Sequence, residues 1–289
     1  MATTKTERLE LQAAREASLI ETLNDRFARE MGDVLKLANA RVRELLRELR
    51  EQDGRLVATK ASLGRVLGLR RDILRALDES GYAALAESLT DGPLDELTRT
   101  VLRGNSIAQA AADLSKTDLT AIAAFKTVRF DELMRLEADL AGQLQRIVLD
   151  GTLGLRPVPH LVDDVADLFD TSLARARSTY DTAISIYSRQ VDQLHATGEP
   201  GELFYYAGPL DTKTRPFCRA RVGKVFPREE LENADNGQMP NPLLTGGGFN
   251  CRHMPKRVSK LDTELQELAE TGDRAPHVQA IFNDMEEAA

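Results

Sequence analysis

One stretch of helical spacing near the start of the sequence constrains the fold most strongly. Between residues 6 and 52 the chain contains no proline and a single glycine, Gly32. Apolar residues follow one another there at steps of three or four: Ile20, Leu23, Phe27, Met31, Val34, Ala38, Val42, Leu45 and Leu49. This spacing places them on one stripe of an α-helix, and a local period of about 11 residues keeps the stripe nearly straight. The stretch predicts a long amphipathic helix packed in a bundle rather than an isolated coiled coil.

The sequence up to residue 200 predicts further helices, because apolar residues recur at helical spacing between breaks at glycine and proline. The predicted helical segments are 63–81, 82–89, 93–102, 118–150 and, as one helix or a pair, 162–195, with an alanine-rich piece beginning at Asn105. Aromatic residues make up only 5% and Trp is absent, so aliphatic side chains must form the core. The predicted class is mainly α: long amphipathic helices forming an elongated bundle, followed by a small α+β C-terminal module.

After residue 201 helical periodicity gives way to short apolar pieces at 203–206 and 224–226 among turn residues. A short helix is expected from Pro227 to about Asn233. Beyond Lys260 the acidic tail predicts one or two marginal helices that become ordered on a partner. The predicted organisation is a helical region at 1–160, connecting helices at 161–200, the module at 201–258 and the tail at 259–289.

The distribution of charge argues against a protein that binds free duplex DNA. The net charge is −8, and residues 259–289 hold two basic against eight acidic side chains. Phosphate binding needs a concentrated basic face. The opening MATTKTERLELQ lacks the apolar core of a signal peptide, and no apolar run of about 18 residues occurs. We expect a soluble protein made in the cytosol, without a membrane segment or a disulfide framework, since the chain has two cysteines.

The module at 201–258 carries the sequence signal that bears on function. A turn of the form Asp211-x-x-Thr214 precedes Cys218, and GGGFNCRH follows at 246–253. The glycines can adopt positive φ and let the chain double back tightly, so that Cys251 approaches the Asp211 turn. Arg252 is expected to pair with Asp211 or Asp235. The stretch predicts a clasp that closes the module.

Four interpretations of Cys218, Cys251 and His253 remain open. They could bind a structural Zn²⁺, with Asp211 or a water as the fourth ligand. The two cysteines could form a disulfide outside the cell, or both could be buried as small apolar side chains. A nucleophilic cysteine with His253 as base has the least support, because residues two apart point in different directions on a regular element. The other histidines, His160, His195 and His277, are expected to be surface or packing residues.

A dense basic loop follows the Asp211 turn and extends to the apolar piece at 224–226. Its members are Lys213, Arg215, Arg219, Arg221 and Lys224. It is either a solvated loop or a contact surface for DNA or an acidic protein partner.

These motifs resemble the phage head-morphogenesis family, the Mu F-like minor head proteins of tailed phages. The family pattern runs Asp-x-x-Thr, Cys, Gly-Lys or similar, a loop, then Asn-Cys-Arg followed by Cys or His, which match Asp211, Thr214, Cys218, 223–224 and 250–253 here. The preceding helix ARSTYDTAISIYSRQ (176–190) also fits, so the resemblance covers about 170–258. Many members carry His-Pro-Asn-Cys-Arg-Cys, where this chain has Gly248 and His253 at the first and last positions.

The resemblance implies a non-enzymatic virion protein, present in several copies in the phage head and in the host cytoplasm during assembly. Its partners would be the portal, the major capsid protein or both, with packaged DNA contacted through the basic loop. The role would lie in head assembly, genome packaging or DNA ejection. Alternatives are a portal-bound connector or neck protein and, from the enzyme class, a zinc-dependent nuclease or toxin that uses the Cys/His module.

Overall fold

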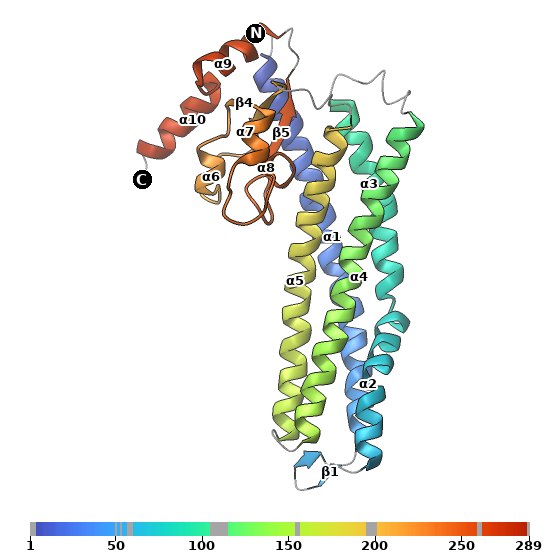
Figure 1. The fold of residues 1–289 in the computed structure, drawn as a ribbon. Coiled ribbons are helices and arrows are strands. Elements are labelled where there is room, and N and C mark those ends of the chain that lie inside the picture. Colours follow the sequence, from blue (N-terminus) through green and yellow to red (C-terminus); the bar gives the residue numbers. More distant parts are fainter. Residues whose placement is uncertain are drawn as a thin grey trace. The chain divides into compact units, whose positions relative to one another are not determined.

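The computed structural model describes residues 4–49, 51–52, 54–56, 60–104, 115–153, 157–194, 201–258 and 262–287. It confirms the mainly α class with a small α+β module toward the C-terminus (Figure 1). The long helices are α1 Lys5–Arg47, α2 Lys60–Glu79, α3 Tyr82–Gly104, α4 Lys116–Thr152 and α5 Val158–Asp192. Among the described residues, no helix is both long and apolar enough to span a membrane.

Two details of the predicted helices are wrong. The first helix ends at Arg47, and Glu51–Gln52 (β1) pairs instead with Arg55–Leu56 (β2) in an antiparallel hairpin. The segments 82–89 and 93–102 form the single helix α3, which runs through Pro93. The alanine-rich piece predicted from Asn105 lies outside the described residues.

Helix α3 continues through Pro93 although proline has no N–H to donate to the carbonyl four residues earlier. That carbonyl belongs to Leu89, and the Tyr180 hydroxyl donates to it at 3.4 Å. Tyr180 is buried in α5, where its ring stacks on Phe27 of α1 with centroids 4.2 Å apart. A side chain from α5 thus replaces part of the hydrogen bonding that proline removes.

The chain divides into two compact units that are not consecutive in sequence. Unit 1 contains residues 1–23, 93–127 and 181–289, and unit 2 contains 24–92 and 128–180. Helices α1, α3, α4 and α5 contribute residues to both units. The units therefore cut across the four segments that the sequence predicts.

The described residues of unit 2 form helices and the β1–β2 hairpin, and most of its buried side chains are aliphatic, as the low aromatic content predicts. Its buried residues include Met31, Ile73, Leu77, Leu89, Leu133, Leu144 and Val165. Buried Tyr82 of α3 donates its hydroxyl to the Leu133 carbonyl of α4 at 3.1 Å. Gln145 of α4 donates to the Val66 carbonyl of α2 at 3.2 Å. These bonds satisfy polar groups that burial would otherwise leave without a partner.

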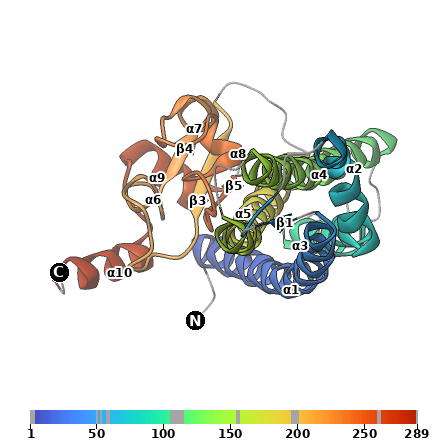
Figure 2. The same cartoon turned by 90° about the horizontal axis from the view of Figure 1, so that it is seen from below.

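Unit 1 contains the sheet, with strand order β4-β3-β5 and antiparallel pairing throughout. Its strands are β3 Leu203–Ala207, β4 Val225–Pro227 and β5 Met254–Arg257; β3 and β4 correspond to the two predicted apolar pieces, whereas β5 is not predicted. Tyr205 pairs with Val225 on one side and with Lys256 on the other. Figure 2 shows the strands with short helices around them, namely α6 Pro216–Arg219, α7 Arg228–Asn233 and α8 Pro242–Thr245.

The acidic tail forms two helices that pack within unit 1, α9 Thr263–Thr271 and α10 Pro276–Glu287. Glu264 of α9 accepts hydrogen bonds from the Lys5 amide at 3.2 Å and the Thr6 hydroxyl at 2.7 Å, at the start of α1. The Ala275 amide donates to the Gly223 carbonyl at 2.7 Å. The tail therefore contacts both the module and the start of α1.

Candidate functional site

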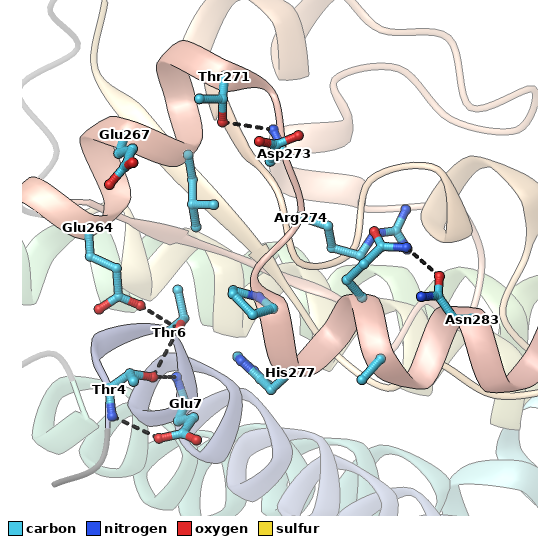
Figure 3. Close-up of a pocket in the computed structure, with 14 residues that line it drawn as sticks. Thr4, Thr6, Glu7, Glu264, Glu267, Thr271, Asp273, Arg274, His277 and Asn283 are labelled. Atoms are coloured by element: carbon cyan, nitrogen blue, oxygen red, sulfur yellow. Dashed lines mark hydrogen bonds between the residues drawn. The ribbon is translucent and has the colours of Figure 1, made fainter.

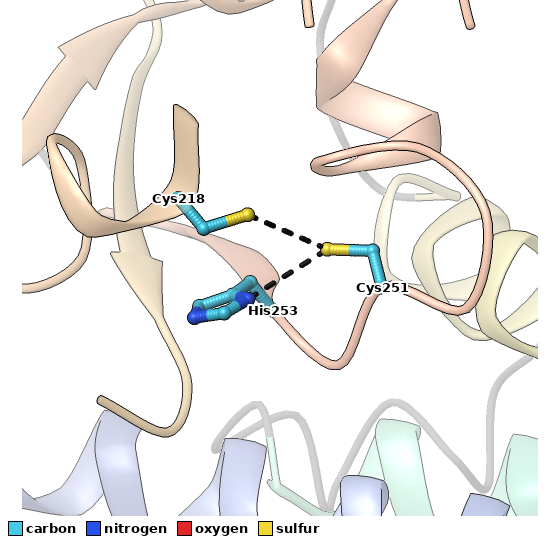
Figure 4. Close-up of side chains that lie close together, drawn as sticks. All are labelled: Cys218, Cys251 and His253. Atoms are coloured by element: carbon cyan, nitrogen blue, oxygen red, sulfur yellow. Dashed lines mark hydrogen bonds between the residues drawn. The ribbon is translucent and has the colours of Figure 1, made fainter. Parts of the chain in front are cut away.

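The predicted Cys/His group is brought together in the structure. Cys218 lies on α6, which begins at Pro216, and Cys251 and His253 lie in the segment that leads into β5 (Figure 4). The Cys251 sulfur is 3.8 Å from the Cys218 sulfur and 3.7 Å from Nδ1 of His253. Among the described residues, the three ligand atoms form a group within 4.8 Å of one another, and all three side chains are buried. Both thiols are free.

The glycine loop (246–248) has no side chains, and this leaves space for the sulfurs of Cys218 and Cys251. Gly246 has φ +59°, and a Cβ there would lie 2.7 Å from the Cys251 sulfur. A Cβ at Gly247 would overlap the Cys218 sulfur. The Gly247 amide also donates to the Cys251 sulfur at 2.9 Å. The clasp predicted from GGGFNCRH is present, and its glycines are needed for close approach as well as for turning.

The hydrogen bonds of His253 determine which ring nitrogen faces the sulfurs. Nε2 lies 2.9 Å from the Pro209 carbonyl oxygen, which can only accept, so Nε2 carries the proton and donates. The other ring nitrogen, Nδ1, faces the Cys251 sulfur at 3.7 Å. The ring also stacks against buried Tyr206, with centroids 5.7 Å apart. The Tyr206 hydroxyl lies 3.5 Å from the Cys218 sulfur.

Electrostatics distinguish the two thiols. The Cys218 thiol donates to Cys251, which lowers the pKa of Cys251 well below its ordinary value, and His253 and Arg189 lower it further against the effect of burial. The same hydrogen bond, together with burial, raises the pKa of Cys218. Burial and the neighbouring cysteines raise the pKa of Tyr206. Cys251 is therefore the more acidic of the two thiols.

Arg189 of α5 holds the clasp in place and was not predicted from the sequence. Its guanidinium is 2% exposed and donates to the carbonyls of Leu244 at 3.1 Å, Cys251 at 2.6 Å and His253 at 2.8 and 3.0 Å. Thr182, two turns earlier on α5, accepts from the Asn250 amide at 3.1 Å. One sequence pattern could have indicated this role. Polar residues recur on one face of this helix at steps of three, four and three: Thr182, Ser185, Arg189 and Asp192. The structure shows that all four are buried.

A buried ion pair fastens β5 to the helices and was also missed. The Lys256 ammonium contacts both carboxylate oxygens of Glu16 at 2.7 and 2.8 Å and Asp192 at 3.2 Å. Burial acts to lower the pKa of Lys256, but the two carboxylates outweigh it and raise the pKa above its ordinary value. In the sequence MPKR (254–257), nothing distinguishes this lysine from a solvent-exposed one, so its role was not predicted.

Asp211 is not brought into the Cys/His group. Its carboxylate forms a two-pronged ion pair with Arg252 at 2.8 Å for each contact and accepts from Thr214 and the Lys213 amide. These bonds, chiefly those of Arg252, lower its pKa to about 2. The predicted Arg252–Asp211 pair is thus confirmed. It occupies both carboxylate oxygens of Asp211, the residue considered above as a fourth metal ligand.

The basic loop makes several of its contacts inside the module. Arg215 donates to the Gly247 carbonyl at 2.9 Å, next to the two sulfurs. The Arg221 guanidinium lies 3.8 Å from the centre of the Phe217 ring and donates to the Phe217 carbonyl. Lys213 is exposed. Two of the five basic side chains therefore support the fold of the clasp.

A cavity of about 940 Å³ lies between the start of α1 and helices α9 and α10 (Figure 3). Its lining includes Glu7 and Glu264, and both carboxylates accept hydrogen bonds at the start of α1. Burial lowers the pKa of Arg274, whose guanidinium lies over the Phe282 ring at 4.0 Å. These contacts are those of a junction between helices.

Neither protein-family models, nor curated proteins, nor solved structures match this chain. The likeness to the Mu F-like family therefore stands on the motif residues alone. Within the described residues, Cys218, Cys251 and His253 form one buried group, the Asp211–Arg252 pair lies partly exposed, and Arg189 and Thr182 of α5 hold the clasp.

Proposed function

We propose that this protein is a structural minor head protein of a tailed phage, associated with the portal vertex or the capsid interior. It acts in head assembly, genome packaging or DNA ejection, in the virion and, during assembly, in the host cytoplasm. The portal, the major capsid protein or both are its partners. It is not an enzyme in this proposal.

The convergence of the motif residues carries the proposal. Asp211 pairs with Arg252, and Cys218 meets Cys251 and His253, so motif positions up to 41 residues apart form one closed unit. The exposed fractions of Cys218, Cys251 and His253 are 1%, 4% and 3%. A substrate would need access to a nucleophile and base, whereas a structural clasp needs burial. The arrangement supports a role in holding the chain's shape rather than in turnover.

An open groove in unit 1 adds a surface suited to a protein partner. It is lined on α1 by Leu11, Ala14 and Ala17, on the Asp211 side by Pro209 and Leu210, and on α10 by Val278 and Ile281. Leu11 and Ile281 are about half exposed. Apolar side chains gathered in a groove, with the exposed carboxylate of Glu21 beside them, are typical of a site that receives an apolar helix face.

Quantitative mass spectrometry of purified particles, from a phage that encodes this chain, tests the proposal. Copies of the protein are counted relative to portal subunits. We expect a reproducible number of copies per particle. A ratio equal to that of the portal favours a connector or neck position, and fewer copies favour the capsid interior. Absence from particles contradicts the proposal.

A second assay separates the structural role from the nuclease alternative. The purified full chain is incubated with plasmid DNA and divalent cations, beside His253→Ala and the exposed-histidine control His160→Ala. We expect no cleavage by any of the three. DNA cleavage that His253→Ala abolishes and His160→Ala retains would establish the enzyme instead.

A further inference from the structure

The buried group of Cys218, Cys251 and His253 has a composition that suits one kind of ligand. Two thiolates and an imidazole are soft or borderline donors, which favour Zn²⁺ over the oxygen-preferring Mg²⁺ and Ca²⁺. We propose that these three side chains bind one Zn²⁺ ion, and that the ion locks the clasp at 246–253 onto α6. This inference concerns the chain's own stability and does not depend on the proposed place in the virion.

The distances between the donor atoms fit a tetrahedral ion. With Zn–S bonds of about 2.3 Å and a Zn–N bond of about 2.0 to 2.1 Å, tetrahedral angles separate two sulfurs by about 3.8 Å and a sulfur from a nitrogen by about 3.6 Å. The observed separations are 3.8 Å between the sulfurs and 3.7 Å between the Cys251 sulfur and Nδ1 of His253. All three donors lie within 4.8 Å of one another. The third pair of donors, on Cys218 and His253, lies within 4.8 Å, so binding of an ion requires a side-chain rotation that brings this pair to about 3.6 Å.

The groups around the donors already hold them as a metal site requires. A ligating histidine usually donates its other ring N–H to a carbonyl or carboxylate, and Nε2 of His253 donates to the Pro209 carbonyl at 2.9 Å. The Gly247 amide donates to the Cys251 sulfur at 2.9 Å. Arg189 fixes the carbonyls of both Cys251 and His253. These partners orient two of the three ligands, Cys251 and His253, and place a proton on Nε2 of His253.

Three protein donors leave the fourth position of the ion to a small ligand such as water. Asp211 does not supply it, because its carboxylate is paired with Arg252. The Tyr206 hydroxyl, 3.5 Å from the Cys218 sulfur, is a polar group beside the donors that can hydrogen-bond to that ligand. Because the group is buried, the ion would serve to cross-link α6 to a segment 33 residues later rather than to meet a substrate.

Metal titration of the reduced full chain tests the inference. The protein is purified with a reductant, stripped with a chelator and titrated with Co²⁺, which reports its ligands by absorbance, and then with Zn²⁺. We expect one Co²⁺ per chain, a sulfur-to-cobalt charge-transfer band, visible bands of tetrahedral cobalt, and displacement by one Zn²⁺. Elemental analysis of the Zn²⁺-loaded chain gives the stoichiometry independently.

Three variants assign the ligands. His253→Cys keeps a third soft donor, so it should still bind one Co²⁺ and should strengthen the charge-transfer band. Cys218→Ser should weaken that band and lower the affinity at least tenfold. His160→Ala, an exposed histidine outside the group, should bind as the wild type does.

The inference is overturned if the reduced chain, with native circular dichroism, takes up neither Co²⁺ nor Zn²⁺. It is also overturned if the cobalt spectrum is the same in His253→Cys and Cys218→Ser as in the wild type, because the metal then lies elsewhere. His253→Cys keeps the test decisive even where Cys218→Ser fails to fold.

Discussion

The buried guanidinium of Arg189 bonds to backbone carbonyls on both sides of the glycine loop. Four contacts reach the carbonyls of Leu244, Cys251 and His253, at distances from 2.6 to 3.1 Å. A loop that turns at three consecutive glycines has little conformational preference of its own. Arg189 supplies the constraint that the loop sequence lacks, and it does so from a helix that precedes the module.

Replacing Arg189 should therefore destabilise the clasp strongly. Arg189→Met keeps much of the side-chain volume but leaves three carbonyls without their donor. We expect a loss of about 3 kcal/mol or more in the free energy of unfolding, measured by urea denaturation. Arg175→Met, an exposed arginine on the same helix, should change it by less than about 0.5 kcal/mol. Equal effects of the two substitutions would contradict this role for Arg189.

Glu10 gives the fold a dependence on pH. Burial raises the pKa of Glu10 from 4.5 to about 7, against the opposing hydrogen bonds from the Gly208 amide and Tyr205 hydroxyl. Between these two pH values the folded chain holds a proton that the unfolded chain has released. The contribution of Glu10 to stability is thus full below pH 4.5 and is lost as the pH rises through about 7.

The substitution Glu10→Gln should remove this dependence. The stability of the variant relative to the wild type is expected to increase as the pH is raised from about 5 to about 8, because only the wild type must ionise a buried carboxyl. Thermal denaturation across that range measures the difference. Glu21→Gln, an exposed glutamate on the same helix, is the control and should show a flat difference. A flat difference for Glu10→Gln as well would show that Glu10 is ionised in the folded chain throughout.

The sequence indicates some of these side chains and not others, for a physical reason. Cys218, Cys251 and His253 stand out because thiols and imidazoles are rare in this chain and occur in a spaced motif. The Arg252–Asp211 pair could be anticipated because opposite charges lay in segments already expected to meet. Arg189, Lys256 and Glu16 could not, since charged residues usually mark a solvated face, and only tertiary packing buries them together.

At the scale of elements, hydrophobic spacing predicted the long helices well, and their ends and breaks less well. A stripe of apolar side chains extends over many turns, so errors at single positions do not change the assignment. The helix α3 is the exception, because Pro93 normally ends or kinks a helix. The Leu89 carbonyl, which Pro93 leaves without its helical donor, accepts from Tyr180, 91 positions away. The local sequence cannot indicate such a distant partner. Strand β5 was missed because four residues of mixed polarity carry no alternation.

A double-mutant cycle between Tyr180 and Pro93 tests this explanation. In the wild type, Tyr180→Phe removes the donor to Leu89 and should cost about 1 kcal/mol. In a Pro93→Ala background the alanine amide can bond to the Leu89 carbonyl, so the same substitution should cost clearly less. Urea denaturation of the four proteins gives the coupling. Costs of Tyr180→Phe that are equal in both backgrounds would mean that its hydroxyl does not compensate for the proline.

At the scale of the whole molecule, the compact units are assembled from separated stretches of chain. The segment 201–258 has its own sheet, yet its closing contacts come from Arg189 and Asp192 on α5 and from Glu10 and Glu16 on α1. The loss of helical periodicity near residue 201 identifies where the module begins. It cannot reveal that the module is incomplete without α1 and α5, two helices that lie far apart in the sequence.

The isolated segment 201–258 should therefore fail to fold cooperatively. Without α1 and α5, Lys256 loses both of its carboxylate partners, and the clasp loses the guanidinium of Arg189. The apolar side chains of the sheet also become exposed. We expect a broad, non-sigmoidal thermal transition by circular dichroism and binding of a hydrophobic dye, beside a sharp transition for the full chain. A sharp transition for the segment alone would establish it as an autonomous domain.

The contact between Glu16 and Lys256 also sets an order of events during synthesis. The two residues are 240 positions apart, and at about 5 to 20 residues per second the ribosome needs about 12 to 48 s to make the interval. All the residues of unit 2 precede position 181, so it can be complete while the carboxylate of Glu16 still has no ammonium to meet. We expect nascent chains that stop before Lys256 to contain a finished unit 2 beside an unclosed unit 1.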